Sequence, residues 1–259
     1  MFQGLGALLD LSETGLVGLM LVFTRVGAVM VLLPGFGERI IPARVRLGLA
    51  IAFTLVVWPM IAPDLLAAPP ERPLLLMVII ETGIGLMLGL AIRLLVIALQ
   101  LAGSIAAQST ALAQIFGAGV APDPMPAIGN VLMLAGVTLA VASGLHVKAA
   151  LAMARSYEIL PMGLPVPAAD LAAWGTARVA QAFALGFSLA APFVIAAFAY
   201  NLALGAINRA MPQLMVAFIG APAITAGGLL ILMLAAPVLL HFWGHRLDLT
   251  LADPFGLPR

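Results

Sequence analysis

The sequence predicts an all-α, multi-helix integral membrane protein, and three observations lead to this fold class. Hydrophobic residues make up 63% of the chain and charged residues only 9%, whereas about a quarter of the residues in soluble domains are charged. The apolar residues form continuous runs, unlike the short alternating segments of about ten residues in a membrane β-barrel. Most runs reach the roughly 20 residues that cross a hydrocarbon core of about 30 Å. A helical bundle with little room for a soluble domain follows.

The apolar runs predict six helical spans, separated by segments rich in proline and glycine. The expected spans are 15–34, 47–63, 74–99, 127–147, 179–207 and 214–243. The breaks "APPERP" (68–73) and "LPVPAAD" (164–170) and the loop "GAGVAPDPMP" (117–126) separate some of them. Pro212 and Pro222 bracket a polar stretch, "NRAMPQLMVAFIGAP". A helical hairpin with proline-broken helices is therefore expected there.

The third run is longer than one membrane crossing needs. It is apolar from Leu74 to about Phe116, and no charged residue occurs between Leu94 and Pro122. That length is about twice what one crossing requires. The run either turns back as a hairpin at Gly103 or continues beyond the bilayer against other protein.

A few polar residues inside the runs are costly enough to need partners. Arg25 lies near the middle of the first run, where an arginine costs about 2.5 to 3.5 kcal/mol on insertion scales. In the third run, steps of four separate Glu81, Gly85, Gly89 and Arg93, so all four lie on one ridge of a helix. The two glycines would admit a close second helix, with an ion pair fixing each end of the seam. Alternatively, both charges lie near the membrane surfaces and extend to water.

A polar stripe continues along the same helix. Arg93, Gln100, Ser104 and Gln108 are spaced by seven, four and four residues, so they share one face. Such a face contacts protein or water and not lipid. It either lines a conduit or seals a subunit contact, and the subunit contact is the simpler interpretation.

The sequence contains few residues that could form a catalytic site, so no enzyme activity, cofactor or metal site is expected. The chain has no cysteine. His241 and His245 have a spacing that could bind a metal, but only Asp248 is nearby to complete a ligand set. An aromatic and histidine cluster at the membrane interface explains them better. No G-x-S-x-G, H-E-x-x-H or Walker motif occurs, and a net charge of +1 gives no electrostatic basis for binding nucleic acid.

A series of motifs follows the mid-span arginine in a definite order. They are "LPGFGERIIPARVRLGLA", Glu81 with its glycines, "LAGSIAAQ", "DPMP", "SGLH", "SYEILPMG", "LAAPF" and the block "NRAMPQLMVAFIGAP". In this order they resemble the FliR family of flagellar type III secretion, whose injectisome relatives are the SctT proteins. The chain departs from the family in having Met215 where asparagine is usual and "APDP" where F-D-P is frequent.

The resemblance implies a fold and a function. One helical export-gate domain, 1–259, would join a FliP-like part (roughly 1–165) to a FliQ-like part (roughly 166–259). With FliP and FliQ, and with FlhB and FlhA nearby, it would form a gated conduit for unfolded flagellar proteins across the bacterial inner membrane, within the flagellar basal body. The family's plug would map onto about 110–126. The implied plug or gate-loop residues are Phe116, Gly117, Asp123 and Pro124.

The resemblance also gives the scarce polar residues a role, because buried polar groups are tolerated where a partner satisfies them. Arg209 and Gln213, at the expected hairpin tip, are placed to bond neighbouring subunits. The residues expected to make subunit contacts or to be buried and polar are Arg25, Glu81, Arg93, Gln100, Gln108, Arg209 and Gln213. Gly85 and Gly89 are expected to serve helix packing.

The main alternative is a secondary transporter of a small solute. Proline-broken runs that contain Arg25 and Glu81 are features that such carriers use at midplane sites. Against this interpretation, no matching pair of broken segments recurs in two halves of the chain.

Overall fold

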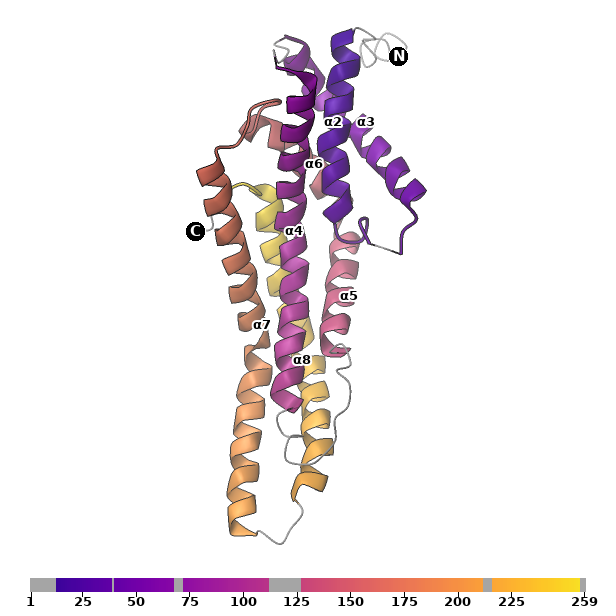
Figure 1. Ribbon diagram of the computed structural model, residues 1–259. Coiled ribbons are helices and arrows are strands. Elements are labelled where there is room, and N and C mark those ends of the chain that lie inside the picture. Colours follow the sequence, from indigo (N-terminus) through magenta and orange to yellow (C-terminus); the bar gives the residue numbers. More distant parts are fainter. Residues whose placement is uncertain (1–12, 39, 68–71, 112–126, 212–215, 257–259) are drawn as a thin grey trace. The chain divides into compact units, whose positions relative to one another are not determined.

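The structure, a computed structural model, is built from helices and their connecting turns. It describes residues 13–38, 40–67, 72–111, 127–211 and 216–256, and it contains no strand within these ranges. The helices, labelled as in Figure 1, are α2 (Glu13–Leu32), α3 (Ala43–Ala67), α4 (Leu74–Ala111), α5 (Ala127–Ala142), α6 (Leu145–Ile159), α7 (Ala168–Ala210) and α8 (Val216–Ala252). The predicted all-α class is confirmed.

Prolines set the starts of three of these helices. Helices α3, α4 and α7 begin directly after Pro42, Pro73 and Pro167. The carbonyl oxygens of these prolines accept hydrogen bonds from backbone N–H groups three or four residues later, at 3.0, 3.1 and 3.0 Å. Proline suits this position because the N–H that it lacks would have no intrahelical partner. Helix α4 begins directly after the predicted break 68–73, whereas α7 begins at Ala168, inside the predicted break 164–170.

Among the described residues, five helices are long and apolar enough to cross a membrane. The qualifying segments are Gly15–Leu32, Ala43–Pro63, Leu74–Ser109, Ala168–Ala210 and Ala223–Ala252. Within the described ranges, prolines lie inside three of these helices, namely Pro59 and Pro63 in α3, Pro192 in α7, and Pro222 and Pro237 in α8, as membrane helices tolerate. The predicted integral membrane architecture with proline-containing helices is therefore supported by both length and composition.

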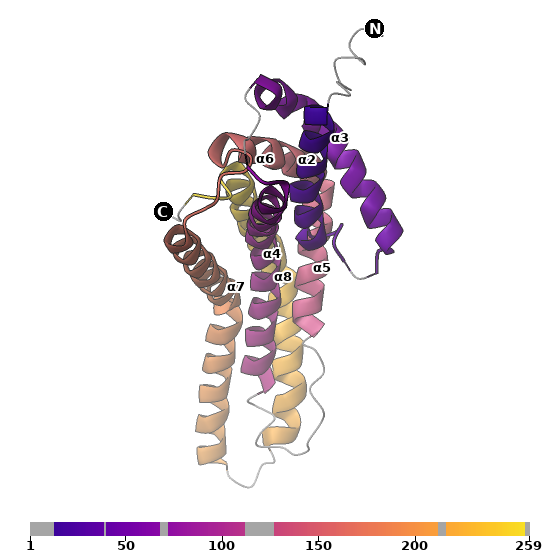
Figure 2. The same cartoon turned by 45° about the horizontal axis from the view of Figure 1, so that its top comes forward.

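The span predicted over 127–147 is not one continuous helix. Helix α5 ends at Ala142, and α6 leaves at an angle of 74° to it; the bend can be followed in Figure 2. The turn depends on Gly144, whose φ of +83° lies in the left-handed region that glycine enters without a steric penalty. The bent pair would count as a sixth span only if both helices together cross the bilayer.

The third run does not turn back at Gly103. Helix α4 is a single helix of 38 residues, which at 1.5 Å per residue is about 57 Å long. This length exceeds a hydrocarbon core of about 30 Å. The alternative of a hairpin at Gly103 is therefore wrong, and the continuation beyond the bilayer against other protein stays a prediction.

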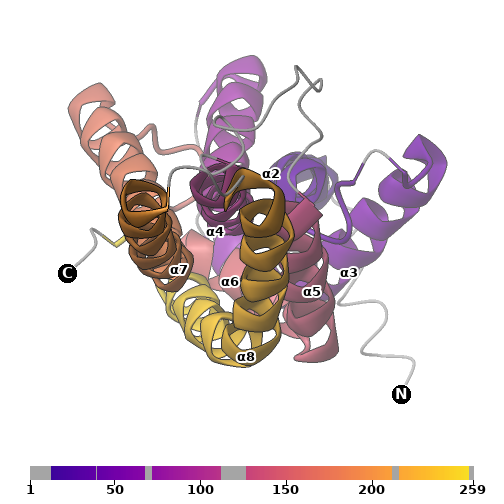
Figure 3. The same cartoon turned by 90° about the horizontal axis from the view of Figure 1, so that it is seen from below.

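Helices α7 and α8 form an antiparallel hairpin between Val179 and Arg246 (Figures 1 and 3). Ala197 of α7 packs on Ile224 of α8, with Tyr200 against both. The hairpin tip differs from the prediction, since α8 begins at Val216 and runs through Pro222. Pro212 lies outside the described residues. Helix α8 also extends past the expected end at 243.

The chain divides into two compact units. Unit 1 comprises 1–94, 140–178 and 247–259, and unit 2 comprises 95–139 and 179–246. In unit 1, α2 packs on α3, and α3 packs on α6. These units are defined by contacts within the chain. The predicted FliP-like and FliQ-like parts are defined by resemblance to other proteins, so that division stays a prediction.

Candidate functional site

Arg25 and Glu81 form a buried ion pair in unit 1, between α2 and α4. The Nε of Arg25 donates to Oε2 of Glu81 at 2.7 Å, and its Nη2 donates to Oε1 at 3.2 Å. Both side chains are 0% exposed. A two-point contact of this kind fits the planar guanidinium and is stronger than a single hydrogen bond. The partner that Arg25 requires is therefore supplied by its own chain.

The pair is completed by groups near the end of α6 and in the loop after it. The Nη1 of Arg25 donates to Ser156 Oγ at 3.0 Å, and Nη2 donates to the Leu160 carbonyl at 3.0 Å. Glu81 Oε1 accepts the backbone N–H of Gly163 at 3.0 Å. These bonds fix the α6–α7 connection to α2 and α4. Their donors and acceptors also offset part of the cost of burying two charges.

An aromatic ring covers the guanidinium. The Cζ of Arg25 lies 3.7 Å from the centre of the Tyr157 ring, a cation–π contact within the usual 6 Å. The Tyr157 hydroxyl is buried and has no hydrogen-bond partner among the described residues. Of the two expected roles, subunit contact or buried polar group, the structure gives Arg25 and Glu81 the second, because both side chains are fully buried within the chain.

Gly85 and Gly89 lie where α2 approaches α4. A Cβ at Gly85 would clash with the Arg25 carbonyl oxygen and lie 2.8 Å from Ala28 Cβ. A Cβ at Gly89 would lie 2.9 Å from Leu32 Cβ. Both positions therefore need glycine for the two backbones to come this close.

The far end of this glycine pair carries a second ion pair. Arg93 Nη1 donates to Glu38 Oε1 at 2.6 Å, and the two side chains are 29% and 36% exposed. An ion pair therefore lies at each end of the glycines, with Glu81 at one end and Arg93 at the other. The outer pair is partly solvated, so it contributes less than the inner one.

The rest of the polar stripe on α4 is only partly used inside the chain. Gln100 Nε2 donates to Met133 Sδ on α5 at 2.7 Å, and Ser104 Oγ donates to the Gln100 carbonyl at 2.9 Å. Gln108 is exposed and has no hydrogen bond to the part of the chain that is described. The stripe is therefore divided: Gln100 serves an internal contact with α5, whereas Gln108 has no such contact among the described residues.

Helices α4 and α5 cross in close contact beside this stripe. A Cβ on Gly103 would overlap the backbone of Gly129, and a Cβ on Gly129 would lie 3.2 Å from the Gln100 carbonyl oxygen. Gly103 thus permits a close helix crossing where the sequence had suggested a turn.

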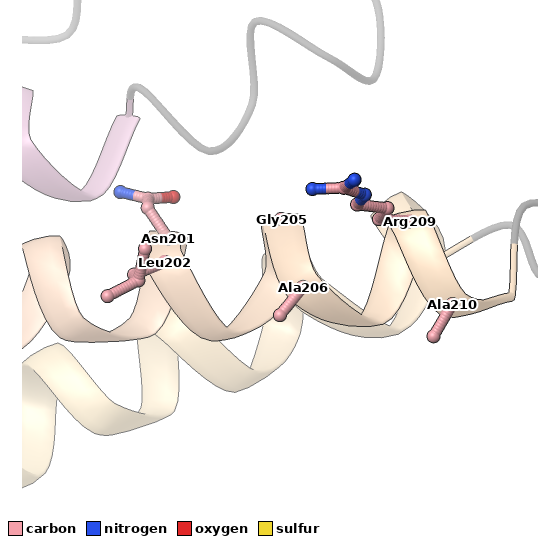
Figure 4. Close-up of a pocket in the computed structure, with 6 residues that line it drawn as sticks. All are labelled: Asn201, Leu202, Gly205, Ala206, Arg209 and Ala210. Carbon is pink, nitrogen blue, oxygen red and sulfur yellow. The ribbon is translucent and has the colours of Figure 1, made fainter.

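Arg209 is exposed in the last turn of α7, in unit 2. A shallow groove runs along this part of α7 (Figure 4), and we call it the α7 groove. It is lined by Asn201, Leu202, Gly205, Ala206, Arg209 and Ala210. Neither Asn201 nor Arg209 has an ion pair or hydrogen bond with the described residues. A cation at a helix C-terminus is favourable, and the described residues offer the guanidinium no side-chain partner.

The remaining predicted site residues cannot be placed. Gln213 and the plug residues Phe116, Gly117, Asp123 and Pro124 lie outside the described residues. Their roles stay predictions. Within the described ranges, no three His, Cys, Asp or Glu side chains gather as a metal site.

One polar cluster escaped the sequence reasoning. In unit 1, Arg178 Nη2 donates to the carbonyls of Asp253, Pro254 and Gly256 at 3.2, 3.0 and 2.7 Å. Trp174 Nε1 donates to the Pro254 carbonyl at 3.2 Å. The acceptors are backbone carbonyls some 75 residues away, so no side-chain pattern in the sequence points to them.

Comparisons with known proteins now decide the family. Residues 16–250 match the profile of "Bacterial export proteins, family 1". This chain belongs to the FliR family of bacterial export proteins. It is 35% identical over 230 residues to the flagellar biosynthetic protein FliR of Caulobacter vibrioides, covering 87% of this chain and 91% of that protein. For the FliR proteins of Aquifex aeolicus and Bacillus subtilis the identities are 29% and 26%, over 88% and 90% of this chain and 88% and 91% of theirs.

Membership in the FliR family confirms the resemblance that the motifs indicated. The relatives are named as flagellar biosynthetic proteins and the family as export proteins. These names agree with a membrane-spanning chain that serves flagellar biosynthesis, and none of them is the name of an enzyme.

Proposed function

We propose that this chain is a subunit of the flagellar type III protein export gate in the bacterial inner membrane, at the flagellar basal body. It assembles with FliP and FliQ, beside FlhB and FlhA, into a gated conduit for unfolded flagellar proteins. The observation that carries the proposal is similarity to FliR proteins over almost the whole chain, 87% of it in the comparison with 35% identity. The division into FliP-like and FliQ-like parts belongs to the same proposal.

The distribution of polar groups supports an assembled subunit. Arg25 and Glu81 are satisfied inside the chain, whereas Gln108, Asn201 and Arg209 have no partner within the described ranges. Polar groups in or near a membrane are stable only when they are paired or reach water. Neighbouring subunits would supply the missing partners.

The same geometry weighs against a solute carrier. A carrier needs its midplane charges accessible to the solute. Here the two charges that suggested this alternative, Arg25 and Glu81, are 0% exposed and bonded to each other. Their place in the fold is structural, which leaves the carrier without an obvious binding site.

Co-purification tests the proposal. We expect the tagged chain, expressed with FliP and FliQ of the same organism, to purify with both in one complex. We also expect a strain that lacks the chain to lose swimming and flagellin secretion, and to regain both when the gene is returned. Solute uptake by the chain alone in lipid vesicles, without such a complex, would favour a carrier.

A substitution at Arg209 connects the proposal to one residue. We expect Arg209→Ala to reduce the yield of the complex before it affects the fold of the isolated chain, because Arg209 is exposed and unpaired in the described chain. Arg155→Ala is the matched control, since Arg155 is also exposed. Complexes of normal size and yield from Arg209→Ala would contradict this role.

A further inference from the structure

A short segment after α8 lies against the first turns of α7 in unit 1. Helix α8 ends at Ala252, and residues 253–256 then run to the start of α7 (Figures 1 and 2). We call 253–256 the C-terminal strap. The backbone N–H of Gly256 donates to Asp253 Oδ1 at 2.8 Å, so the strap is a turn with a hydrogen bond of its own and does not continue the helix.

The strap is held on α7 through its backbone. The Pro254 carbonyl accepts hydrogen bonds from both Arg178 Nη2 and Trp174 Nε1, at 3.0 and 3.2 Å. Trp174 and Arg178 are four residues apart, so they lie on one side of α7. They are 5% and 8% exposed. Buried donors of this kind need acceptors, and the strap supplies them.

The strap also reaches α4 through one aromatic side chain. Phe255 packs against a buried cluster that contains Met87 and Ala91 of α4 and Trp174 of α7. Val166, in the connection before α7, packs against the same cluster. Burial of aromatic surface is the largest apolar contribution that a four-residue segment can offer. Phe255 therefore joins the start of α7 to α4.

The position of the strap in the chain gives these contacts a topological consequence. Helix α7 passes from unit 1 into unit 2 after Arg178, and α8 returns to unit 1 at Leu247. The hydrogen bonds from Arg178 to the strap span 75 to 78 residues of chain. They close a loop that contains the whole of 179–246, which costs conformational entropy until both ends of that loop are in place.

We propose that the C-terminal strap is a conformational clamp on the base of the α7–α8 hairpin, meaning the helix ends 168–178 and 247–252 in unit 1. In the closed state the strap holds the first turns of α7 against α4 and against the end of α8. Release of the strap lets these turns move apart. This inference goes beyond the proposed function and does not depend on it, because every contact in it lies within one chain.

The contacts favour a clamp that opens before the surrounding helices unfold. The strap is not helical, and its Asp253 is exposed, so water reaches it. When the strap leaves, water can replace the carbonyls that Arg178 loses, so the guanidinium does not stay buried without acceptors. Short segments with few buried contacts open at a lower free energy than the core of a domain. The Arg25–Glu81 pair, with both side chains 0% exposed, belongs to that core.

A distance measurement between two spin labels tests the clamp. The chain has no cysteine, so Ala172→Cys and Leu249→Cys label the two helix ends at exposed positions within unit 1. In the full chain in lipid nanodiscs we expect one narrow distance distribution. In a chain that ends after Ala252 we expect the distribution to become about twice as broad or to gain a second distance. An equally narrow distribution without the strap would overturn the proposal.

A single substitution repeats this test without shortening the chain. We expect Phe255→Ala to broaden the distribution and Phe255→Leu to broaden it less, because leucine keeps part of the apolar contact. Leu151→Ala is the matched control, since Leu151 is an exposed apolar residue of α6 in the same unit. Equal broadening in Phe255→Ala and Leu151→Ala would overturn the proposal. Circular dichroism identifies a variant that has lost its helices, and Phe255→Leu then carries the test.

Hydrogen exchange shows whether the effect stays local. In Phe255→Ala we expect amide exchange in 168–178 to rise about tenfold or more, while exchange in 15–32 of α2 stays within about twofold of the unaltered chain. An equal rise in both segments would make the strap a general contributor to the stability of unit 1 and would overturn its role as a clamp. Unchanged exchange in 168–178 would also overturn it, because the strap would then be held by α7 without holding α7 in return.

Discussion

Glu81 holds Arg25 through both carboxylate oxygens, at 2.7 and 3.2 Å, in a place where neither side chain is exposed. Burying a single charge away from water costs a large amount of free energy. Burying two opposite charges together costs less, because each replaces part of the hydration that the other has lost. The pair joins α2 to α4 and, through Ser156 and Gly163, the end of α6 to both. The stability of unit 1 therefore depends on neither charge being left alone.

Removing one charge should destabilise unit 1 strongly. We expect Glu81→Ala to lower the free energy of unfolding by about 3 to 5 kcal/mol, because a buried guanidinium loses its counter-ion. Glu38→Ala, which breaks the partly exposed pair with Arg93, should cost about 1 kcal/mol or less. Thermal and denaturant unfolding of the purified chain in detergent measures both. Equal losses would show that burial of the inner pair has no energetic consequence.

Replacing both inner charges should restore much of that loss. In Arg25→Met with Glu81→Met, no charge remains buried, and apolar side chains of similar length fill the space. We expect the double variant to be more stable than Glu81→Ala in the same unfolding measurement. A double variant as unstable as the single one would mean that hydrogen bonds to Ser156 and Gly163 outweigh the ion pair.

Two glycines two residues apart on α4, Gly83 and Gly85, should respond oppositely to a methyl group because they face different sides of the helix. Gly85→Ala places a Cβ against the Arg25 carbonyl and 2.8 Å from Ala28 Cβ, and overpacking of this kind typically costs about 1 to 3 kcal/mol. Gly83→Ala meets no described atom within 4 Å and should gain up to about 1 kcal/mol from better helix propensity. Thermal unfolding in detergent compares them, and the same sign for both would contradict the close α2–α4 contact.

The α4–α5 crossing should be asymmetric. A methyl group on Gly103 overlaps the Gly129 backbone, so the two helices must separate, whereas one on Gly129 lies 3.2 Å from the Gln100 carbonyl oxygen and needs only a small shift. We expect Gly103→Ala to lower the melting temperature clearly and Gly129→Ala to change it little. If Gly129→Ala is the more damaging, the crossing is not as the structure has it.

The helices were largely predictable because apolar runs and prolines are local signals. The fold class followed from composition, and the span expected from 74 begins directly after Pro73 as α4 does. The spans expected from 47 and 179 begin later than the helices that follow Pro42 and Pro167, which start at Ala43 and Ala168. The bend at Gly144 was not predictable. An isolated glycine in an apolar run is compatible with a straight helix, and only tertiary packing makes it take a positive φ.

The polar sites were predictable as residues but not as pairs. A mid-span arginine must have a partner, and the spacing of Glu81, Gly85 and Gly89 indicates one helix ridge. Nothing local says that Glu81 meets Arg25, or that Arg93 meets Glu38. The Arg178 cluster was missed for a related reason: its acceptors are backbone carbonyls, which every residue carries.

Loss of the Arg178 guanidinium should free the segment that follows α8. Hydrogen bonds from a charged donor contribute about 1.5 to 3 kcal/mol each, and Arg178 supplies them to Asp253, Pro254 and Gly256. In Arg178→Met, the Trp174 contact to Pro254 and the packing of Phe255 against Met87, Ala91 and Trp174 remain. We still expect amide hydrogen exchange in 253–256 to rise by about tenfold or more. In Arg178→Lys, amide hydrogen exchange in 253–256 should lie between that of the unaltered chain and that of Arg178→Met, because an ammonium group is compact and lacks the planar fork of a guanidinium. Mass-spectrometric exchange of the C-terminal peptide measures this, with Arg155→Met as the exposed control. Exchange that rises equally in both variants would point to general loosening of unit 1, and unchanged exchange would mean that the carbonyl contacts do not hold the segment.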